Sequence, residues 1–120
     1  MFTFSQKSGV LRRNGDYVYA GWAGQGAGKN NPIMQGVHNI GPLPRGRYLI
    51  GDAYTHPHLG PVVMNLTPDQ ANEMFGRSDF RIHGASFVRP ELSSHGCIIM
   101  PRDVRIQINL GPDKILEVIE

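Results

Sequence analysis

The residues of this chain that could carry out chemistry are concentrated in two short runs, Ile82-His83-Gly84 and Ser94-His95-Gly96-Cys97. The chain has one cysteine and five histidines. A thiol attacks well only as the thiolate, and a nearby imidazole can take its proton and later return it to a leaving amine. The two runs therefore indicate a nucleophile, Cys97, with His83 and His95 as the candidate bases.

The spacing of these residues predicts how they come together. Residues 84–96 separate His83 from Cys97, which suits two adjacent strands joined by a loop. His95 lies two residues before Cys97, so an extended backbone would point both side chains to one face.

The residues just before Cys97 have predicted supporting roles. A tetrahedral intermediate needs backbone N–H donors for its oxyanion, and Gly96 would let a substrate carbonyl approach them without hindrance. The hydroxyl of Ser94 can hydrogen-bond a histidine ring nitrogen and so fix one tautomer.

The residue types alone leave other interpretations open. Cys97 could be an inert core residue, because Gly96–Met100 has the length and apolar content of a buried strand. His83, His95 and Cys97 could instead be three zinc ligands, although no fourth ligand is evident. We assign the remaining histidines to loops, and Arg81 with Asp79 to a solvated strand edge, without a site role.

Composition restricts the classes of protein to consider. The 120 residues suit one domain, which we place at 1–120, and 15 glycines with nine prolines favour short strands and tight turns. The net charge is only +2 and the basic residues are scattered, which argues against nucleic-acid binding. No apolar run has the length of a signal peptide or a membrane span, so we expect synthesis in the cytoplasm and no membrane insertion.

The pattern along the chain predicts a mainly β domain with two short helices. A hairpin is expected around Asn14-Gly15, and further strands are expected at residues 47–50, 61–66 and 114–119. The glycine-containing segment 21–31 is expected to be a mobile surface loop. One helix is predicted from Thr67, a possible N-cap, to Gly76, and a second from Pro101 to Leu110.

The two site runs, with further segments in the same order, resemble the L,D-transpeptidase catalytic domain, and most closely the type VI secretion L,D-transpeptidase effectors of Gram-negative bacteria. The segments that carry this resemblance span most of the chain: Gly21–Gly24, Gly41–Tyr48, Phe75–Gly84, Ser94–Ile99 and Pro101–Arg105.

This resemblance implies a β-sandwich-like catalytic domain and a specific reaction. Cys97 would attack the carbonyl of the third residue of a peptidoglycan stem, usually meso-diaminopimelate, and expel the terminal D-alanine, with His83 as the base. His95, Gly96, Ser94 and Gly84 would support this site. Water as acceptor gives an L,D-carboxypeptidase, and an amine gives cross-linking or exchange. No cofactor and no metal are expected.

The resemblance also implies partners and a location. Such effectors are antibacterial toxins delivered into the periplasm of a target cell, so an immunity protein and a component of the secretion apparatus are expected partners. Alternatives are a non-catalytic peptidoglycan-binding module, the zinc protein above, and a cysteine endopeptidase that cuts within the stem.

The chain departs from the housekeeping enzymes at two points. The segment between His83 and Ser94 is shorter than usual, and Ile99 occupies a position where those enzymes often have arginine. Arg102 or Arg105 would then supply the contact to a substrate carboxylate.

Overall fold

A computed structural model describes residues 1–120, and its strands form one mixed sheet. The strands are β1 (Phe2–Ser5), β2 (Val10–Arg13), β3 (Asp16–Ala20), β4 (Trp22–Ala23), β5 (Gly46–Ile50), β6 (Tyr54–His56), β7 (Gly60–Pro68), β8 (Arg81–His83), β9 (Ile98–Ile99) and β10 (Ile115–Ile119). Their order is β3-β2-β1-β10-β5-β7-β8-β9-β4, and β6 pairs with β7. The helices are α1 (Arg102–Leu110) and three 3-10 turns, Gly26–Gly28, Pro32–Met34 and Pro90–Leu92.

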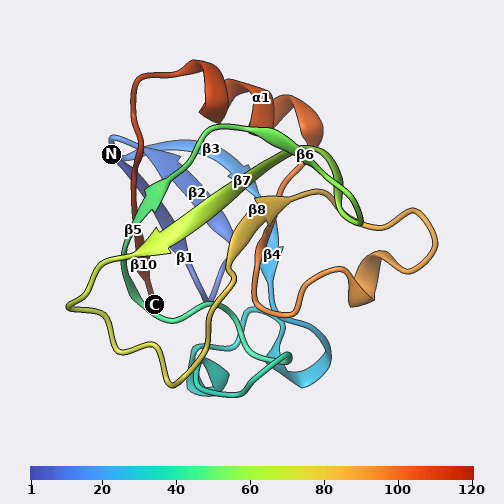
Figure 1. Ribbon diagram of the computed structural model, residues 1–120. Helices are drawn as coiled ribbons and strands as arrows, with labels where there is room; N and C mark the ends of the chain where they lie inside the picture. Colours follow the sequence, from blue (N-terminus) through green and yellow to red (C-terminus); the bar gives the residue numbers. More distant parts are fainter.

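The two edges of this sheet are joined by one residue, so the sheet is nearly a closed barrel (Figure 1). Strand β3 ends at Ala20 and β4 begins at Trp22, with Gly21 between them. The N–H of Gly21 donates to the carbonyl of Gly9 at 2.9 Å. A Cβ on Gly21 would collide with the carbonyl oxygen of Ile99, and one on Gly9 would collide with that of Gly21. The closure therefore depends on two residues without side chains.

Alternating apolar residues fill the inside of the barrel. In β1, Phe2 and Phe4 are buried while their neighbours are only half-buried, as expected for a strand with one face toward a core. Helix α1 covers one end of the barrel, where Val104 and Ile108 join the same core (Figure 1). No helix of the protein is both long enough and apolar enough to cross a membrane.

The prediction of a mainly β chain is confirmed, as are several of its elements. The hairpin turns at Asn14-Gly15, where both residues have positive φ, 50° and 88°. This matches the turn geometry that Asn-Gly favours in two-residue hairpins. The strands predicted at 47–50, 61–66 and 114–119 correspond to β5, β7 and β10, and the second predicted helix is α1.

The sandwich-like arrangement and the first predicted helix are wrong. The sheet curls into one barrel instead of stacking as two layers. Thr67 and Pro68 belong to β7, where they pair with Leu49 and Tyr48 of β5. The chain then turns at Asp69, whose carboxylate accepts the N–H of Ala71 at 2.8 Å. Strand pairing thus overrides a local N-cap signal, since Asp in such a turn competes with the helix for the backbone.

The segment 21–31 is not the mobile surface loop that its glycines suggested. Strand β4 pairs with β9, and Ala23 is fully buried. Gly28 is buried so close to Ile40 that a Cβ would collide with the Ile40 carbonyl. Here glycine permits close backbone packing instead of mobility.

Replacing Gly21 with alanine is predicted to destabilise the barrel by about 2–3 kcal/mol, because the added methyl forces β4 away from β9. Urea denaturation gives the free energy of unfolding. Gly51→Ala is the matched control: its Cβ would meet only ordinary contacts from 3.5 Å, so its effect should be about 0.5 kcal/mol or less. Equal effects of the two substitutions would contradict this view of the closure.

Candidate functional site

His83 lies at the end of β8, and Cys97 directly precedes the adjacent parallel strand β9, which is close to the arrangement that their spacing predicted. In the register of β8 and β9, Ile82 is opposite Ile98 and His83 is opposite Ile99. Ile82 and Ile98 point into the core. Since side chains alternate along a strand, Cys97 and His83 lie on the opposite, outer face of the barrel.

A cavity of about 330 Å³ lies over this outer face and contains the nucleophile and both candidate bases. It is lined by Asn39, Leu59, Ser78, Asp79, Phe80, Arg81, His83, Ser93, His95 and Cys97. A smaller polar cavity of about 230 Å³ adjoins it and shares Asn39, Ser78, Asp79, Phe80 and His95. The two together form a cleft with the thiol toward one side.

The sulfur of Cys97 lies in a largely buried position with two backbone partners. The residue is 9% exposed. Its Sγ accepts the N–H of Arg81 at 3.3 Å and lies 3.8 Å from the carbonyl oxygen of Asp79, to which the thiol can donate. Burial raises the pKa of the Cys97 thiol, and the N–H of Arg81 opposes this only in part. The thiol is therefore protonated at neutral pH.

His83 is held in one tautomer by its neighbour. Its Nδ1 lies 2.9 Å from the carbonyl oxygen of Gly84, and because a carbonyl only accepts, Nδ1 carries the proton. Burial lowers the pKa of His83, so the neutral ring is the resting form and Nε2 has a free lone pair. The carbonyl of Gly84 thus fixes the tautomer of His83 and leaves the lone pair of Nε2 available.

No hydrogen bond joins the Cys97 thiol to either imidazole, since Sγ pairs with the N–H of Arg81 and the carbonyl of Asp79. A rotation about the Cα–Cβ bond of Cys97 would redirect its S–H within the cavity. Catalytic hydrogen bonds are often long or misaligned before substrate binds, so this geometry is compatible with a Cys–His pair.

Ser94 does not contact a histidine ring, contrary to the expectation from sequence. Its buried hydroxyl accepts the N–H groups of Gly24 at 2.8 Å and Gly96 at 3.1 Å, and it donates to the carbonyl of Cys97 at 2.6 Å. The hydroxyl thus bridges the chain after β4 to the chain before β9, where the ladder between these strands would otherwise continue. Ser94 fixes the backbone of the nucleophile.

Gly96 is required for packing, in a different way from that expected. Its φ is +128°, and a Cβ would lie 2.5 Å from the guanidinium of Arg77 and 2.7 Å from the ring of Phe80. Arg77 is buried and donates to the carbonyls of Gln35, Pro42, Gly41 and His95. This arginine, which sequence reasoning did not single out, joins three segments beneath the cleft.

Arg105 holds backbone segments together, and the substrate contact expected of it stays a prediction. It is 7% exposed and donates to the carbonyls of Met100 (3.0 Å), Pro61 (2.9 Å) and Val62 (2.9 Å). A Cβ on Gly84 would meet its guanidinium at 2.7 Å. Arg102 is exposed at the start of α1 and does not line the cleft, and its role stays a prediction.

The structure brings His95 and Cys97 into one cavity, although the stretch before β9 is irregular and not part of the strand.

The structure has no group of three or more His, Cys, Asp or Glu residues placed to hold a metal ion. His83, His95 and Cys97, the trio suggested for zinc, therefore do not form such a group.

Arg81, which we assigned to a solvated edge, lines the cleft beside the nucleophile. It is only half-buried and lies two residues before His83 on the same strand face. That spacing was visible in the sequence. What the sequence did not show is the cavity over this face, which Arg81 lines together with Cys97.

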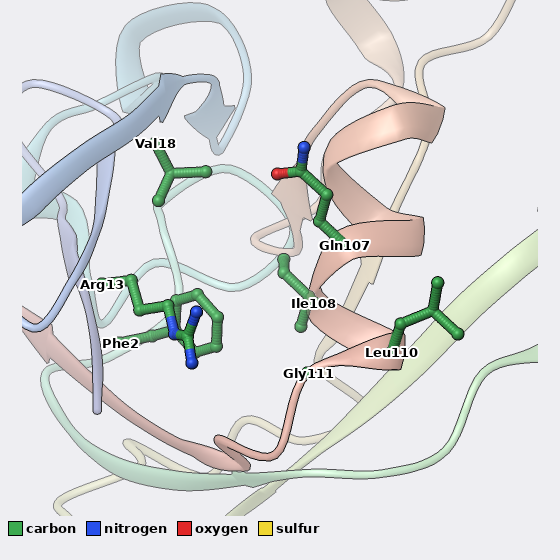
Figure 2. Close-up of a pocket in the computed structure, with 7 residues that line it drawn as sticks. All are labelled: Phe2, Arg13, Val18, Gln107, Ile108, Leu110 and Gly111. Carbon is green, nitrogen blue, oxygen red and sulfur yellow. The ribbon is translucent and has the colours of Figure 1, made fainter.

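A separate cavity of about 380 Å³ lies between α1 and the first strands, away from Cys97 (Figure 2). It is lined by Phe2, Arg13, Val18, Gln107, Ile108, Leu110 and Gly111. It contains no thiol, imidazole or carboxylate, so it offers no groups for acyl transfer.

Comparison with known families gives one match. The family model described as Tlde1 domain matches residues 17–110, which include β8, β9 and all the residues of the cleft. Neither the curated proteins nor the solved structures include a significant match to the chain.

Ser94→Ala is predicted to lower the free energy of unfolding by about 2–4 kcal/mol, because the N–H groups of Gly24 and Gly96 lose a buried partner. The neighbouring Ser93→Ala removes a half-buried hydroxyl with a single strong bond, to the N–H of Ser86, and should cost about 1 kcal/mol or less. Thermal or urea unfolding measures both, and a Ser94 effect no larger than that of Ser93 would contradict the assignment.

Proposed function

Because this chain belongs to the Tlde1 domain family of type VI L,D-transpeptidase effectors, we propose that it is a cysteine acyl-transfer enzyme acting on peptidoglycan tetrapeptide stems. The observation that carries the proposal is the placement of His83, on β8, and Cys97, directly before the adjacent parallel strand β9, in one cavity. The residue types, the fixed tautomer of His83 and the family all support the same reaction.

In the first step, Cys97 Sγ attacks the carbonyl carbon of the third stem residue. The S–H proton passes to Nε2 of His83 as the S–C bond forms, and the carbonyl oxygen takes the negative charge. When the C–N bond breaks, the imidazolium returns this proton to the amine of the departing D-alanine. The products are a thioester on Cys97, free D-alanine and a neutral His83.

The oxyanion needs an amide donor beside the nucleophile. The N–H of Gly96 is already bonded to Ser94 Oγ. The N–H of Cys97 has no partner within the chain, and we assign it as the oxyanion donor. A preformed donor of this kind acts without reorganisation during the reaction, which is why such groups contribute strongly to catalysis.

The second step releases the thioester. Water, deprotonated by His83 Nε2, would give the tripeptide, and the enzyme would be an L,D-carboxypeptidase. An amine would give a 3→3 cross-link or an exchanged terminal D-amino acid. Both outcomes use the same groups, and they differ only in which acceptor enters the cleft.

Membership of this effector family supports a setting of bacterial competition for the proposed activity. We propose that the protein acts in the periplasm of a target cell after delivery by the secretion apparatus, and that the producing cell holds an immunity protein. Peptidoglycan stems are the substrate, and the reaction as written uses no cofactor.

The proposal is tested by incubating the protein with purified tetrapeptide muropeptides and identifying products by mass spectrometry. Loss of one alanine is expected, and loss of a dipeptide would indicate an endopeptidase instead. Cys97→Ala should abolish turnover, and His83→Gln should lower kcat by at least about 100-fold. Binding to sacculi without any product would favour a non-catalytic wall-binding module and overturn the proposal.

The pH dependence should show that thiol and imidazole are both neutral at rest. Because burial lowers the pKa of His83, kcat/KM should fall on acidification only below about pH 6.5, the ordinary pKa of histidine, where the ring becomes protonated. Because burial raises the pKa of Cys97, alkylation by iodoacetamide without substrate should reach half its maximal rate only above about pH 8.5. Rapid alkylation at pH 6 would instead indicate a preformed thiolate–imidazolium pair.

A further inference from the structure

Arg81 lies beside the nucleophile with a guanidinium that the protein itself holds in place. Continuing the register of β8 and β9 by one residue puts Arg81 opposite Cys97, on the same outer face. Paired side chains of neighbouring parallel strands start from backbones about 4.8 Å apart. The two residues also line the same cavity, so any substrate over the sulfur lies near this cation.

Two contacts orient the guanidinium. Its Nε donates to the hydroxyl of Tyr54 at 3.2 Å, and its Nη1 donates to the carbonyl of Asp79 at 3.2 Å. The Tyr54 hydroxyl in turn donates to Asn65 Oδ1 at 2.6 Å, so the Tyr54 oxygen is left free to accept from Arg81. Asn65 lies opposite Arg81 in the pairing of β7 with β8. A chain of hydrogen bonds therefore fixes the direction of the arginine.

The charge of Arg81 has no counterion in the chain. Nη2 has no hydrogen-bond partner, and no carboxylate lies within ion-pair distance. The carboxylate of Asp79 borders the same cavity without pairing to Arg81. A half-buried, oriented guanidinium with a free N–H edge is suited to bind a carboxylate, because its planar donors match the two oxygens.

We propose that Arg81 binds the terminal carboxylate of the tetrapeptide stem and so selects stems that end in a free D-amino acid. This rests on the proposed function, which puts the scissile carbonyl at Cys97. The terminal carboxylate belongs to the residue after that carbonyl, and successive residues are 3.8 Å apart. This distance is comparable to the spacing between the strands that carry Cys97 and Arg81. Arg81 thus provides the carboxylate contact that we had expected from Arg102 or Arg105.

The experiment compares three stem peptides: the tetrapeptide with a free terminal carboxylate, its terminal amide, and a peptide amidated only on the side-chain carboxylate of the third residue. Wild-type enzyme should prefer the free acid to the terminal amide by about 10- to 100-fold in kcat/KM, as expected for one charge-assisted contact. Amidation of the side chain of the third residue should change kcat/KM by less than about threefold. This result would show that the preference depends on the terminal carboxylate and not on the side-chain carboxylate.

Arg81→Gln should remove this preference. It should lower kcat/KM for the free acid to near the value for the terminal amide, mainly through KM, and leave the amide almost unchanged. Arg81→Lys should retain part of the preference, because the charge remains without the planar donors. The matched control is Arg12→Gln, at an exposed arginine of β2 outside the cleft. It should leave kcat/KM unchanged for both the free acid and the terminal amide. Equal losses for acid and amide would mean a structural role only and would overturn the proposal.

A binding measurement separates this inference from the proposed function. In a Cys97→Ala background, which cannot turn over substrate, calorimetry should show tighter binding of the free acid than of the terminal amide. Adding Arg81→Gln should abolish that difference. If wild-type enzyme turned over no stem but this pattern held, the acyl-transfer proposal would fail and the carboxylate site would stand. Equal binding of acid and amide to Cys97→Ala would overturn the carboxylate site, whatever the activity.

Discussion

The pairing of β8 with β9 is the constraint on which the rest of the site depends. These strands are only three and two residues long, yet their parallel register alone determines that His83 and Cys97 share a face. A shift of one residue would exchange the core and cavity faces of β9, because side chains alternate along a strand. The thiol would then lie among the residues that fill the barrel. The site therefore needs a stable register between β8 and β9, and these strands are too short to fix that register by their own pairing.

The groups that secure this register are mostly polar and come from outside the two strands. Ser94 links the chain before β9 to the chain after β4, and β4 is held in turn by the one-residue closure at Gly21. Arg77 holds the carbonyl of His95 together with carbonyls of the segment 35–42. Burial lowers the pKa of Arg77, but four carbonyl partners compensate the buried charge. The same contacts therefore close the barrel and position the site, so a substitution that disturbs the closure is expected to disturb the site as well.

Residue types and spacing were enough to predict β5, β7, β10, the hairpin at Asn14-Gly15, α1 and the proximity of Cys97 to His83. These features depend on patterns within about fifteen residues. The predictions were wrong where contacts with segments remote in sequence determine the local structure. Thr67 and Pro68 carry a local helix signal, but their pairing with β5 prevails. The glycine at position 21 favours a prediction of flexibility, because the carbonyl that lies against it, that of Ile99, is remote in sequence. Arg77 gave no signal in the sequence for the same reason, since its carbonyl partners lie on segments that are 18 or more residues away.

Arg77, Arg105 and Arg81 differ in burial and in the number of their hydrogen bonds, and this difference suggests which of them stabilise the fold and which binds substrate. Arg77 and Arg105 are almost fully buried, each donates to three or more carbonyls, and neither lines the cavity that contains Cys97. Arg81 is half-buried, and its two contacts orient it without neutralising its charge. A neutral thiol and a neutral imidazole attract no anionic peptide, so the recognition of a terminal carboxylate must come from another group in the cleft. An oriented, unpaired guanidinium one strand away from the sulfur meets this requirement.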